Sequence, residues 1–343
     1  MARIKEVAEL AGVSTATVSR VLNGIVVRAD LAERVSWAIA ELEYAPDRTA
    51  RSLRRRYSDV IALVLPDIEN PFFTALARGV EDVAQEAGYS VVLCNTDDLH
   101  EKERQYLRVA EVENMAGVLI APASDDPALA GLLERRRSVV VLDRRIDAHV
   151  DHVAFDNVRL GREAAEGLVR RGFRRIACVT GPAATSTALD RAKGWRDALR
   201  EAGLDAPDEL LVYANFRVDG GFEAFSALRA LPEPPDAIVA TNNLVAVGVL
   251  RALADEDGRP VTTPPAVEDP PESGVGPRLG IAVIGELPFA TSRTAEVLVT
   301  PLNPRELGRR AASMLLERIR GLDAPPRYVE SASLGPDVDP ATA

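Results

Sequence analysis

The segment Gly12-Val13-Ser14-Thr15-Ala16-Thr17-Val18-Ser19-Arg20-Val21-Leu22-Asn23 decides how the start of this chain is interpreted. Apolar residues in the segment before it recur at i, i+3, i+4 and i+7, as one face of a helix requires: Ile4, Val7, Ala8 and Ala11. Gly12 allows a tight turn after this helix, and Ser14 can accept a hydrogen bond from an unpaired backbone N–H of the next one. The sequence therefore predicts two short helices joined by a turn.

The second predicted helix has two different faces. The inward one carries Thr15, Val18, Val21 and Leu22, and the outward one carries Ala16, Ser19, Arg20 and Asn23 at the same helical spacing. Small and hydroxylic side chains let a helix lie close in the DNA major groove, where Arg binds the edge of a guanine. A solvated amphipathic helix pair is the simpler alternative. The outward face favours sequence-specific DNA binding.

Two further segments follow. A third helix is predicted at about 30–43, because one apolar stripe can close a core over the first two helices: Leu31, Val35, Ala38, Ile39 and Leu42. Five Arg then lie between positions 48 and 56, and they would repel one another in a free helix. We expect this segment to be loosely structured alone and helical on DNA. A solvated linker is the alternative.

Composition limits the rest of the chain. Residues 1–59 hold 10 Lys and Arg against 8 Asp and Glu, a small net positive charge, whereas the remainder holds 31 against 44, a net negative charge. The negative remainder would repel DNA, so we expect the N-terminal region to provide the attraction to it. Cys94 and Cys178 lie in apolar runs and are interpreted as core thiols rather than as a disulfide or a metal pair. The sequence has no membrane-spanning run and no signal peptide, so we expect a cytoplasmic protein and no membrane partner.

From residue 60 onward, short apolar strands alternate with helices. The predicted strands are 60–65, 90–94, 117–120, 139–142, 153–155, 176–180, 210–213, 237–240 and 281–284, and the helices between them are 72–87, 101–114, 160–171, 188–202, 220–230 and 244–255. This alternation predicts two Rossmann-like subdomains with parallel sheets and a ligand cleft between them. The predicted domains are a helix-turn-helix at 1–45, a hinge at 46–58, a core at 59–330 and a tail at 331–343. In the core, the first subdomain covers about 59–157 and 287–320, and the second about 158–286.

The N-terminal region resembles the lactose/galactose-repressor (LacI/GalR) family, on the runs Ile4-Lys5-Glu6-Val7-Ala8, Gly12-Val13-Ser14 and Thr17-Val18-Ser19-Arg20-Val21-Leu22-Asn23-Gly24. The resemblance implies that Thr15, Ala16 and Arg20 contact bases. It also implies that the phosphates are contacted mostly by Ser14, Thr17, Ser19 and Asn23. Residues 46–58 resemble the family's hinge helix, with Arg48 as a DNA contact, Ala50 near the minor-groove floor and Leu53 as a wedge between base steps. Arg28 and Leu31 stand where the family has a Ser or Thr cap and a Thr. Two phosphate contacts of the family are therefore less well supported here by the resemblance, although Arg28 could substitute electrostatically.

The core resembles the same family's effector-binding domain, which is akin to periplasmic sugar-binding proteins. The matching residues are Asp67, Asn70-Pro71-Phe72-Phe73, Asn95-Thr96-Asp97, Asp143-Arg144, Asp156-Asn157, Gly181-Pro182, Arg191, Gly194-Trp195, Phe216 and Asn242. By resemblance, Phe72 and Phe73 flank the ligand, Phe216 stacks on its apolar face, and Arg191 and Asn242 donate hydrogen bonds to it. The predicted ligand-binding set is completed by Asn70, Asp97, Arg144 and Glu286. A small polyol or a purine suits planar aromatic rings beside an Arg.

Three departures limit how far the effector can be identified. Asn243 stands where the family usually has Asp. Gly285-Glu286-Leu287-Pro288-Phe289 replaces the usual Gly-Phe-Asp-Asp, so Glu286 substitutes for the ligand-binding carboxylate on a longer stem. Residues 259–278 form an insertion rich in Pro and Gly, which cannot bury a core, so we interpret it as a surface loop. Its topology places it near the cleft, where an inert loop and a lid are the alternatives, and we favour the inert loop.

These observations predict a homodimeric transcriptional repressor. It would bind an inverted-repeat operator, and a small effector in the cleft, most simply a sugar, would control its affinity for DNA. The alternatives are a repressor that uses a purine-type corepressor and a solute-binding protein for transport, although the latter leaves the helix-turn-helix unexplained. We expect no cofactor and no enzymatic activity. The sequence has no Walker loop and no Gly-x-Ser-x-Gly elbow, and its three His are not arranged for catalysis.

Overall fold

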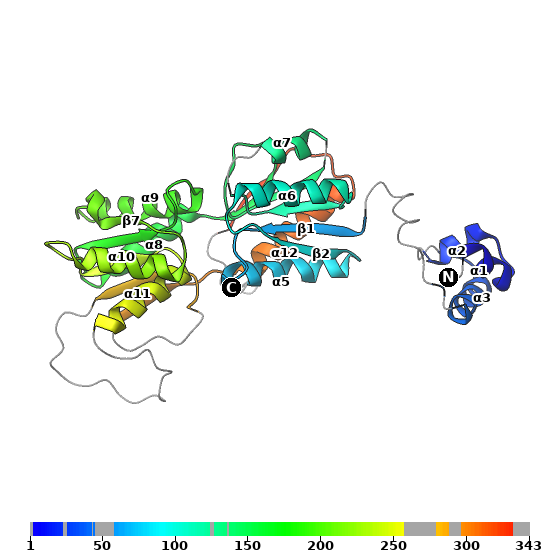
Figure 1. Cartoon of the computed structure of the whole chain (residues 1–343), viewed down its shortest axis with the longest axis horizontal. Coiled ribbons are helices and arrows are strands. Elements are labelled where there is room, and N and C mark those ends of the chain that lie inside the picture. The colour runs from blue at the N-terminus through cyan, green and yellow to red at the C-terminus, as the bar shows by residue number, and fades with distance from the viewer. Residues whose placement is uncertain are drawn as a thin grey trace, which may run out of the picture. The chain divides into compact units, whose positions relative to one another are not determined.

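The computed structural model describes residues 3–22, 26–42, 44, 58–123, 127–135, 137–256, 279–287 and 296–331. The chain divides into two compact units, residues 1–58 and 59–343 (Figure 1). Several predictions lie outside the described residues: the DNA contacts Asn23, Arg48, Ala50 and Leu53, the hinge helix at 46–57, and the insertion at 259–278.

The first unit contains the three predicted helices, α1 (Ile4–Ala11), α2 (Thr15–Leu22) and α3 (Ala29–Glu41). Its core is formed by the predicted apolar stripes, with these fully or nearly fully buried members: Val7, Ala8, Ala11, Val18, Val35 and Ala38. Gly12 ends α1 with a φ of 60°, a left-handed conformation that glycine adopts at little cost. Ser14 Oγ accepts a hydrogen bond from Thr17 N at 3.1 Å. Both local predictions are confirmed.

The first subdomain of the second unit is a six-stranded parallel sheet in the order β11-β5-β4-β3-β1-β2. Its strands are β1 (Val60–Leu65), β2 (Ser90–Asn95), β3 (Gly117–Ile120), β4 (Ser138–Leu142), β5 (Asp151–Phe155) and β11 (Tyr328–Ser331). Helices α5 (Pro71–Glu86) and α12 (Pro304–Ile319) cover one face, and α6 (His100–Val112) and α7 (Pro127–Glu134) cover the other (Figure 1). Apolar strands covered on both faces are typical of parallel sheets.

The second subdomain is a five-stranded parallel sheet in the order β10-β9-β8-β6-β7. Its strands are β6 (Ile176–Thr180), β7 (Leu211–Tyr213), β8 (Ala237–Ala240), β9 (Gly280–Ile284) and β10 (Glu296–Thr300). A 3-10 turn, η1 (Asp208–Leu210), precedes β7, and the helices are α8 (Asn157–Arg170), α9 (Ser186–Glu201), α10 (Val218–Arg229) and α11 (Asn243–Glu256). The two sheets confirm the predicted pair of Rossmann-like subdomains.

The structure corrects the boundary between the subdomains in the last part of the chain. Strand β10 pairs with β9, so residues 296–300 belong to the second subdomain and not to the first, as the predicted segment 287–320 required. The chain returns to the first subdomain only after Thr300, where α12 begins at Pro304. Strand β11 then pairs with β5, which extends the first subdomain beyond residue 320. Residue 331 ends this strand instead of beginning a tail.

Helices α5 and α12 pack with their backbones almost in contact. A Cβ atom added to Gly79 would lie 1.9 Å from the carbonyl oxygen of Arg305, and one added to Gly308 would lie 2.1 Å from that of Leu76. Both distances are far shorter than van der Waals contact. Only glycine at these two positions permits this crossing of the helices.

Candidate functional site

The exposed face of α2 presents the residues predicted to contact bases. Ala16 and Arg20 are exposed and Ser19 is half-buried, as predicted, with Arg20 in the last turn of the helix. Thr15 is also exposed, which corrects the expectation that it faces inward but keeps it available to DNA. Ser14 lies directly before α2, and its exposed side chain caps the start of this helix. The hydroxyls of Ser14 and Thr17 lie 3.0 Å apart.

Arg28 does not provide the free charge expected as a replacement for a missing phosphate contact. Its Nη2 lies 2.6 Å from Asp30 Oδ2, and its Nε donates a second hydrogen bond, of 3.0 Å, to Asp30 Oδ1. This bidentate pair partly neutralises the guanidinium and holds the pKa of Asp30 below its ordinary value. A phosphate near Arg28 would have to compete with a carboxylate.

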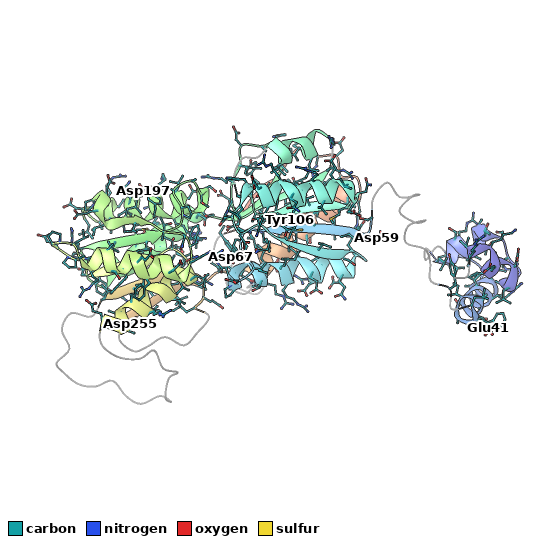
Figure 2. The ribbon with its side chains drawn as sticks, viewed as in Figure 1. Glu41, Asp59, Asp67, Tyr106, Asp197 and Asp255 are labelled. Atoms are coloured by element: carbon teal, nitrogen blue, oxygen red, sulfur yellow. The ribbon has the colours of Figure 1, made fainter. Side chains whose placement is uncertain are left out.

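A cavity of about 620 Å³ lies in the second unit and is lined by both of its subdomains. Asp67, which contributes to its wall, lies where the two subdomains meet (Figure 2). The cavity brings together eight of the nine residues predicted from the sequence: Asn70, Phe72, Phe73, Arg144, Arg191, Phe216, Asn242 and Glu286. Its position beyond the carboxyl ends of the strands is that of ligand sites in open α/β sheets.

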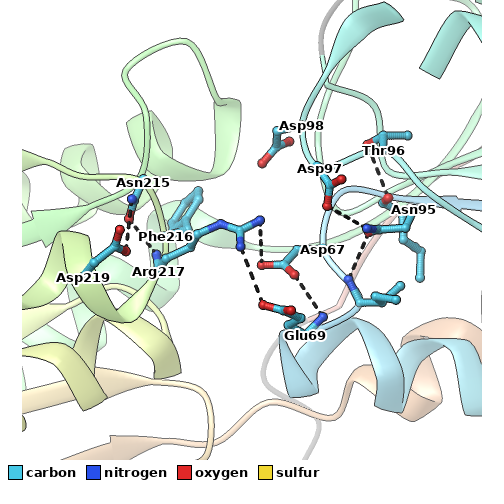
Figure 3. A network of polar contacts seen from close by, with 12 residues as sticks. Asp67, Glu69, Asn95, Thr96, Asp97, Asp98, Asn215, Phe216, Arg217 and Asp219 are labelled. Atoms are coloured by element: carbon cyan, nitrogen blue, oxygen red, sulfur yellow. Dashed lines mark hydrogen bonds and ion pairs between the residues drawn. The ribbon is translucent and has the colours of Figure 1, made fainter. Parts of the chain in front are cut away.

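Asp97, the ninth predicted residue, is not among the residues that line the cavity. It accepts a hydrogen bond of 2.7 Å from Asn95 Nδ2 and forms an ion pair with Lys102. Asp98 lines the cavity instead and is paired with Arg144 (Figure 3 shows both Asp residues). Asp97 and Asp98 both have positive φ, 51° and 58°. Two successive left-handed residues reorient the chain after β2, and the sequence pattern does not reveal which of the two carboxylates then faces the cavity.

Arg191 is held in the cavity wall by its own subdomain. Its Nε donates to Asn157 Oδ1 at 2.8 Å, and its Nη1 donates to the carbonyl oxygen of Thr241. The side chain is buried, and burial lowers its pKa against the opposing attraction of Asp143 and Asp190. A Cβ atom on Gly161 of α8 would lie 2.0 Å from the carbonyl oxygen of Arg191, so this glycine lets α9 approach closely enough for the bond to Asn157.

Asp143 is a buried carboxylate of the cavity. Its φ is 60°, it follows β4 directly, and its Oδ1 accepts no hydrogen bond from a described residue. Burial raises the pKa of this carboxyl group, although Arg191 and Arg144 oppose the shift. An unpartnered buried carboxylate oxygen is costly and requires a proton donor, which a ligand in the cavity can supply. Asp143 belongs to the Asp143-Arg144 pair that resembles the family, but of the two only Arg144 is in the predicted ligand-binding set.

Phe216 forms an aromatic wall on the second subdomain. Its φ is 59°, and its carbonyl oxygen accepts a hydrogen bond of 2.9 Å from Asn242 Nδ2. A Cβ atom on Gly181 would lie 2.0 Å from the Phe216 ring, so the absence of a side chain at Gly181 leaves the space that the ring occupies. Asn242 Oδ1 in turn accepts from Val245 N at 2.8 Å and caps α11. Asn242 thus positions Phe216 as well as lining the cavity.

The other aromatic wall begins α5. Asn70 Oδ1 accepts a hydrogen bond of 3.0 Å from Phe72 N and caps the helix. The rings of Phe72 and Phe73 meet edge to face with their centroids 5.0 Å apart, and Phe72 also contacts Phe155 at 6.2 Å. Edge-to-face packing fixes both rings without filling the cavity between the subdomains.

The charges that line the cavity are balanced. Four carboxylates (Asp67, Asp98, Asp143 and Glu286) stand beside four guanidinium groups (Arg144, Arg191, Arg217 and Arg305). Arg144 pairs with Asp98, Arg217 with Asp67, and Arg305 with Asp82 on the neighbouring helix α5. Glu286 is exposed and follows Gly285 at the end of β9. Three of the four arginines are thus paired with carboxylates, whereas Arg191 bonds to Asn157 and to the Thr241 carbonyl, so a phosphate would find one buried guanidinium rather than a cluster of them.

Other kinds of site have no support in the described part of the chain. These residues contain no group of three or more His, Cys, Asp and Glu placed to bind a metal ion. Cys94 and Cys178 are free and buried, which confirms their interpretation as core thiols. No helix within the described ranges is both long and apolar enough to cross a membrane.

Two family models match the chain, one for each unit. Residues 3–47 match the model for bacterial regulatory proteins of the lacI family. Residues 58–333 match the model for periplasmic binding proteins and the sugar-binding domain of the LacI family. The division at residue 58 agrees with the division between the compact units.

Individual proteins resemble the chain over nearly its whole length. The ribose operon repressor of Escherichia coli (strain K12) is 34% identical over 325 residues, 93% of each chain. The HTH-type transcriptional repressor PurR of Vibrio atlanticus (strain LGP32) is 31% identical over 339 residues, 96% of each chain. Among solved structures, the transcriptional regulator CelR in complex with cellobiose has a TM-score of 0.68 and 27% identity, with 97% of each chain covered.

Proposed function

We propose, from the premise that this chain belongs to the LacI family of bacterial transcriptional regulators, that its effector is a small uncharged sugar, with a pentose such as D-ribose as the first candidate. The chain is a DNA-binding repressor with an effector-binding domain. What remains to be proposed is the ligand of the cavity and the way in which that ligand controls DNA binding.

The observation that carries the proposal is the Asp143 oxygen, which has no hydrogen-bond partner among the described residues and lies in a charge-balanced cavity with aromatic walls. Sugar hydroxyls donate to carboxylates, and the C–H faces of a sugar ring pack on aromatic rings such as Phe72 and Phe216. Arg144 and Arg217 are already paired with Asp98 and Asp67, and these carboxylates would repel the two negative charges of a phosphorylated sugar. A neutral polyol meets none of this repulsion, and ribose operon repressors are among the chain's relatives.

A purine is the second candidate, because the PurR relative is similar over 96% of this chain and Phe216 offers a flat apolar face. Calorimetry on the purified full-length protein with D-ribose, D-ribose 5-phosphate, cellobiose and guanine separates the candidates. We expect D-ribose to bind and the phosphorylated sugar to bind far more weakly. Binding of guanine alone would replace the sugar with a purine, and tight binding of the phosphate ester would refute the charge argument.

Asp143→Asn is expected to weaken effector binding about tenfold while leaving the core as stable as before or more stable at pH 7. The folded-state pKa of Asp143 is raised, so the stability associated with its protonated form is present at low pH and is lost as the pH rises through that pKa. The Asn side chain does not ionise, so the variant does not lose stability in this way as the pH rises. Its advantage in unfolding free energy over the parent should therefore be larger at pH 7 than at pH 4, as measured by urea denaturation.

The same variant has a matched control in Asp147→Asn, which changes a carboxylate outside the residues that line the cavity. If Asp143→Asn binds D-ribose as the parent does, the carboxylate is not a ligand contact. If its stability follows the same pH profile as that of the parent, the buried carboxylate does not titrate as described.

We further propose that the protein acts as a cytoplasmic homodimer on an inverted-repeat operator. Strand β2 is at the edge of the first sheet, and its side chains Val92 and Leu93 are exposed by 41% and 43%. Exposed apolar side chains on an edge strand favour pairing with another chain, and a second copy gives the two-fold symmetry that an inverted repeat needs. Sedimentation equilibrium of the purified protein tests this, since a monomer at micromolar concentration would contradict it.

Leu53→Ala is expected to reduce DNA bending and to lower specific operator affinity by about tenfold, because Leu53 is proposed as the apolar wedge between base steps. Energy transfer between dyes at the two ends of an operator fragment measures the bend. The effector-binding core should unfold at the same temperature in the variant and the parent. An unchanged bend would remove the wedge role from Leu53.

A further inference from the structure

We propose that Arg217 is a positioning residue for effector binding, which draws the two subdomains together at the mouth of the cavity before the effector arrives. This inference rests on the proposed function in one respect, that the cavity is the effector site. Arg217 belongs to the second subdomain and follows β7. Its Nη2 lies 3.5 Å from Asp67 Oδ2, and its Nη1 lies 3.8 Å from Glu69 Oε2, both on the first subdomain (Figure 3).

The backbone that presents Arg217 is fixed by side chains of its own loop. Asn215 Oδ1 accepts a hydrogen bond from Arg217 N at 3.0 Å, and Asn215 Nδ2 donates to Asp219 Oδ1 at 3.2 Å. Asp219 lies in the first turn of α10, so its bond with Asn215 ties the loop to the start of this helix (Figure 3). A residue on a fixed loop loses little backbone entropy when its side chain makes an ion pair.

The carboxylates on the opposite side are also anchored. Asp67 Oδ1 accepts from Glu69 N at 2.9 Å, and Asn95 Oδ1 accepts from Ile68 N at 3.1 Å. Asp67 lines the cavity beside Asn70 and Phe72 and is only 12% exposed at its side chain. The contact of Arg217 with Asp67 is therefore a contact between two rigid loops, and a change in its length reports movement of one subdomain against the other.

Arg217 is adjacent in the chain to Phe216, so the ion pair between the subdomains and the aromatic wall of the cavity are carried by neighbouring residues. Phe216, the preceding residue, places its ring in the cavity with a left-handed backbone, and both residues line the cavity (Figure 3). Because Asn242 holds the Phe216 carbonyl, the backbone that carries both side chains is fixed to the second subdomain and moves with it. A shift that brings Arg217 nearer to Asp67 also brings the Phe216 ring nearer to the first subdomain.

The length of the contact gives Arg217 its specific role. A second connection between the subdomains has hydrogen-bond geometry: Arg145 lies 2.7 Å from Asp190, and Arg145 N donates to Ser186 Oγ at 2.9 Å. The contacts of Arg217 are longer than ordinary charged hydrogen bonds, and its side chain is 39% exposed, so its attraction acts mainly through Coulomb's law and is screened by salt. An uncharged sugar should then bind with an affinity that depends on ionic strength, which its own chemistry does not explain.

The first test measures D-ribose affinity of the full-length protein by calorimetry at about 0.05 M and about 0.5 M salt. We expect the parent to lose about threefold in affinity at the higher salt concentration, and Arg217→Gln to be about threefold weaker at low salt and insensitive to salt. Glu69→Gln should give an intermediate result. Arg229→Gln is the matched control, because Arg229 pairs with Glu256 and does not line the cavity. Equal salt dependence in the parent and Arg217→Gln would overturn the proposal.

The second test needs no ligand. Gln105→Cys on α6 and Ala227→Cys on α10 are exposed positions in different subdomains, whereas Cys94 and Cys178 are buried and escape labelling. Energy transfer between dyes at the two new cysteines should fall with salt in the parent background and stay constant with Arg217→Gln. If D-ribose fails to bind but this difference is seen, the proposed effector is wrong and the role of Arg217 stands. If transfer responds equally to salt in both proteins, Arg217 does not draw the subdomains together.

Discussion

Arg191→Ala is expected to abolish the response to the effector while DNA binding without effector stays intact. The guanidinium is buried in the cavity wall and held by Asn157 and Thr241, so its remaining N–H groups are oriented before a ligand arrives. A charged hydrogen bond to a ligand contributes about 1.5–3 kcal/mol, and two of them account for a loss of at least about 100-fold in affinity. Calorimetry with D-ribose measures the affinity, and operator binding with and without the sugar measures the response.

The same experiment includes two comparisons. Arg200→Ala, on the exposed face of the same helix, should leave effector binding unchanged. Glu286→Gln should weaken binding less than Arg191→Ala, because Glu286 is exposed at the end of β9 whereas Arg191 is buried. Because a ligand shifts a conformational equilibrium only through its difference in affinity for the two states, the loss of effector response must follow the loss of binding. Undiminished affinity in Arg191→Ala would refute this assignment of the pocket.

Arg20→Ala is expected to lower operator affinity by about 1–3 kcal/mol and to relax the base preference at one position in each half-site. Arg20 is exposed in the last turn of α2, on the face that also carries Ala16. A bidentate contact with a guanine edge explains both effects, since loss of a phosphate contact would weaken binding to all sequences alike. Binding to a library of half-site variants, measured at one salt concentration, distinguishes the two cases.

Lys5→Ala provides the control for Arg20, because Lys5 is an exposed cation on α1 and pairs only loosely with Glu9 at 4.0 Å. It removes the same charge from the same unit without changing α2. If Arg20→Ala and Lys5→Ala lower affinity equally and leave the base preference unchanged, Arg20 is not a base-reading residue. A footprint on a direct repeat would also contradict the proposed dimer.

Local sequence patterns predicted most of the fold because the information they use is local. The apolar stripe of α1, the Ser14 cap and the alternating strands depend on residues within a few positions of one another, and the structure confirms them. Strand β10 was missed because its assignment depends on pairing with β9 across residues 285–295, and no short-range pattern specifies that partner. Helix α7 was missed because it is only eight residues long and its composition is almost wholly apolar.

The candidate site was predictable where side-chain type alone decides the role. Arg191, Phe216 and Asn242 carry a charge, a ring and an amide that few other residues can replace, and all three line the cavity. Where the prediction of a site residue was wrong, the backbone conformation was the reason. Asp97 and Asp98 are chemically identical neighbours, and only their left-handed φ angles determine that the second one faces the cavity. Arg217 gave no signal in the sequence, because its role depends on carboxylates about 150 positions earlier in the chain.

The near-contact of helix backbones at Gly79 and Gly308 has a mechanical consequence. Two helices whose carbonyl oxygens occupy the space of a missing side chain cannot slide or roll without a clash, so α5 and α12 behave as one stiff beam. The glycines Gly161 and Gly194 give α8 and α9 the same property in the second subdomain. Among the described residues, we therefore expect bending to be concentrated in the connecting segments between the subdomains, near residues 156 and 301–303, rather than in the paired helices.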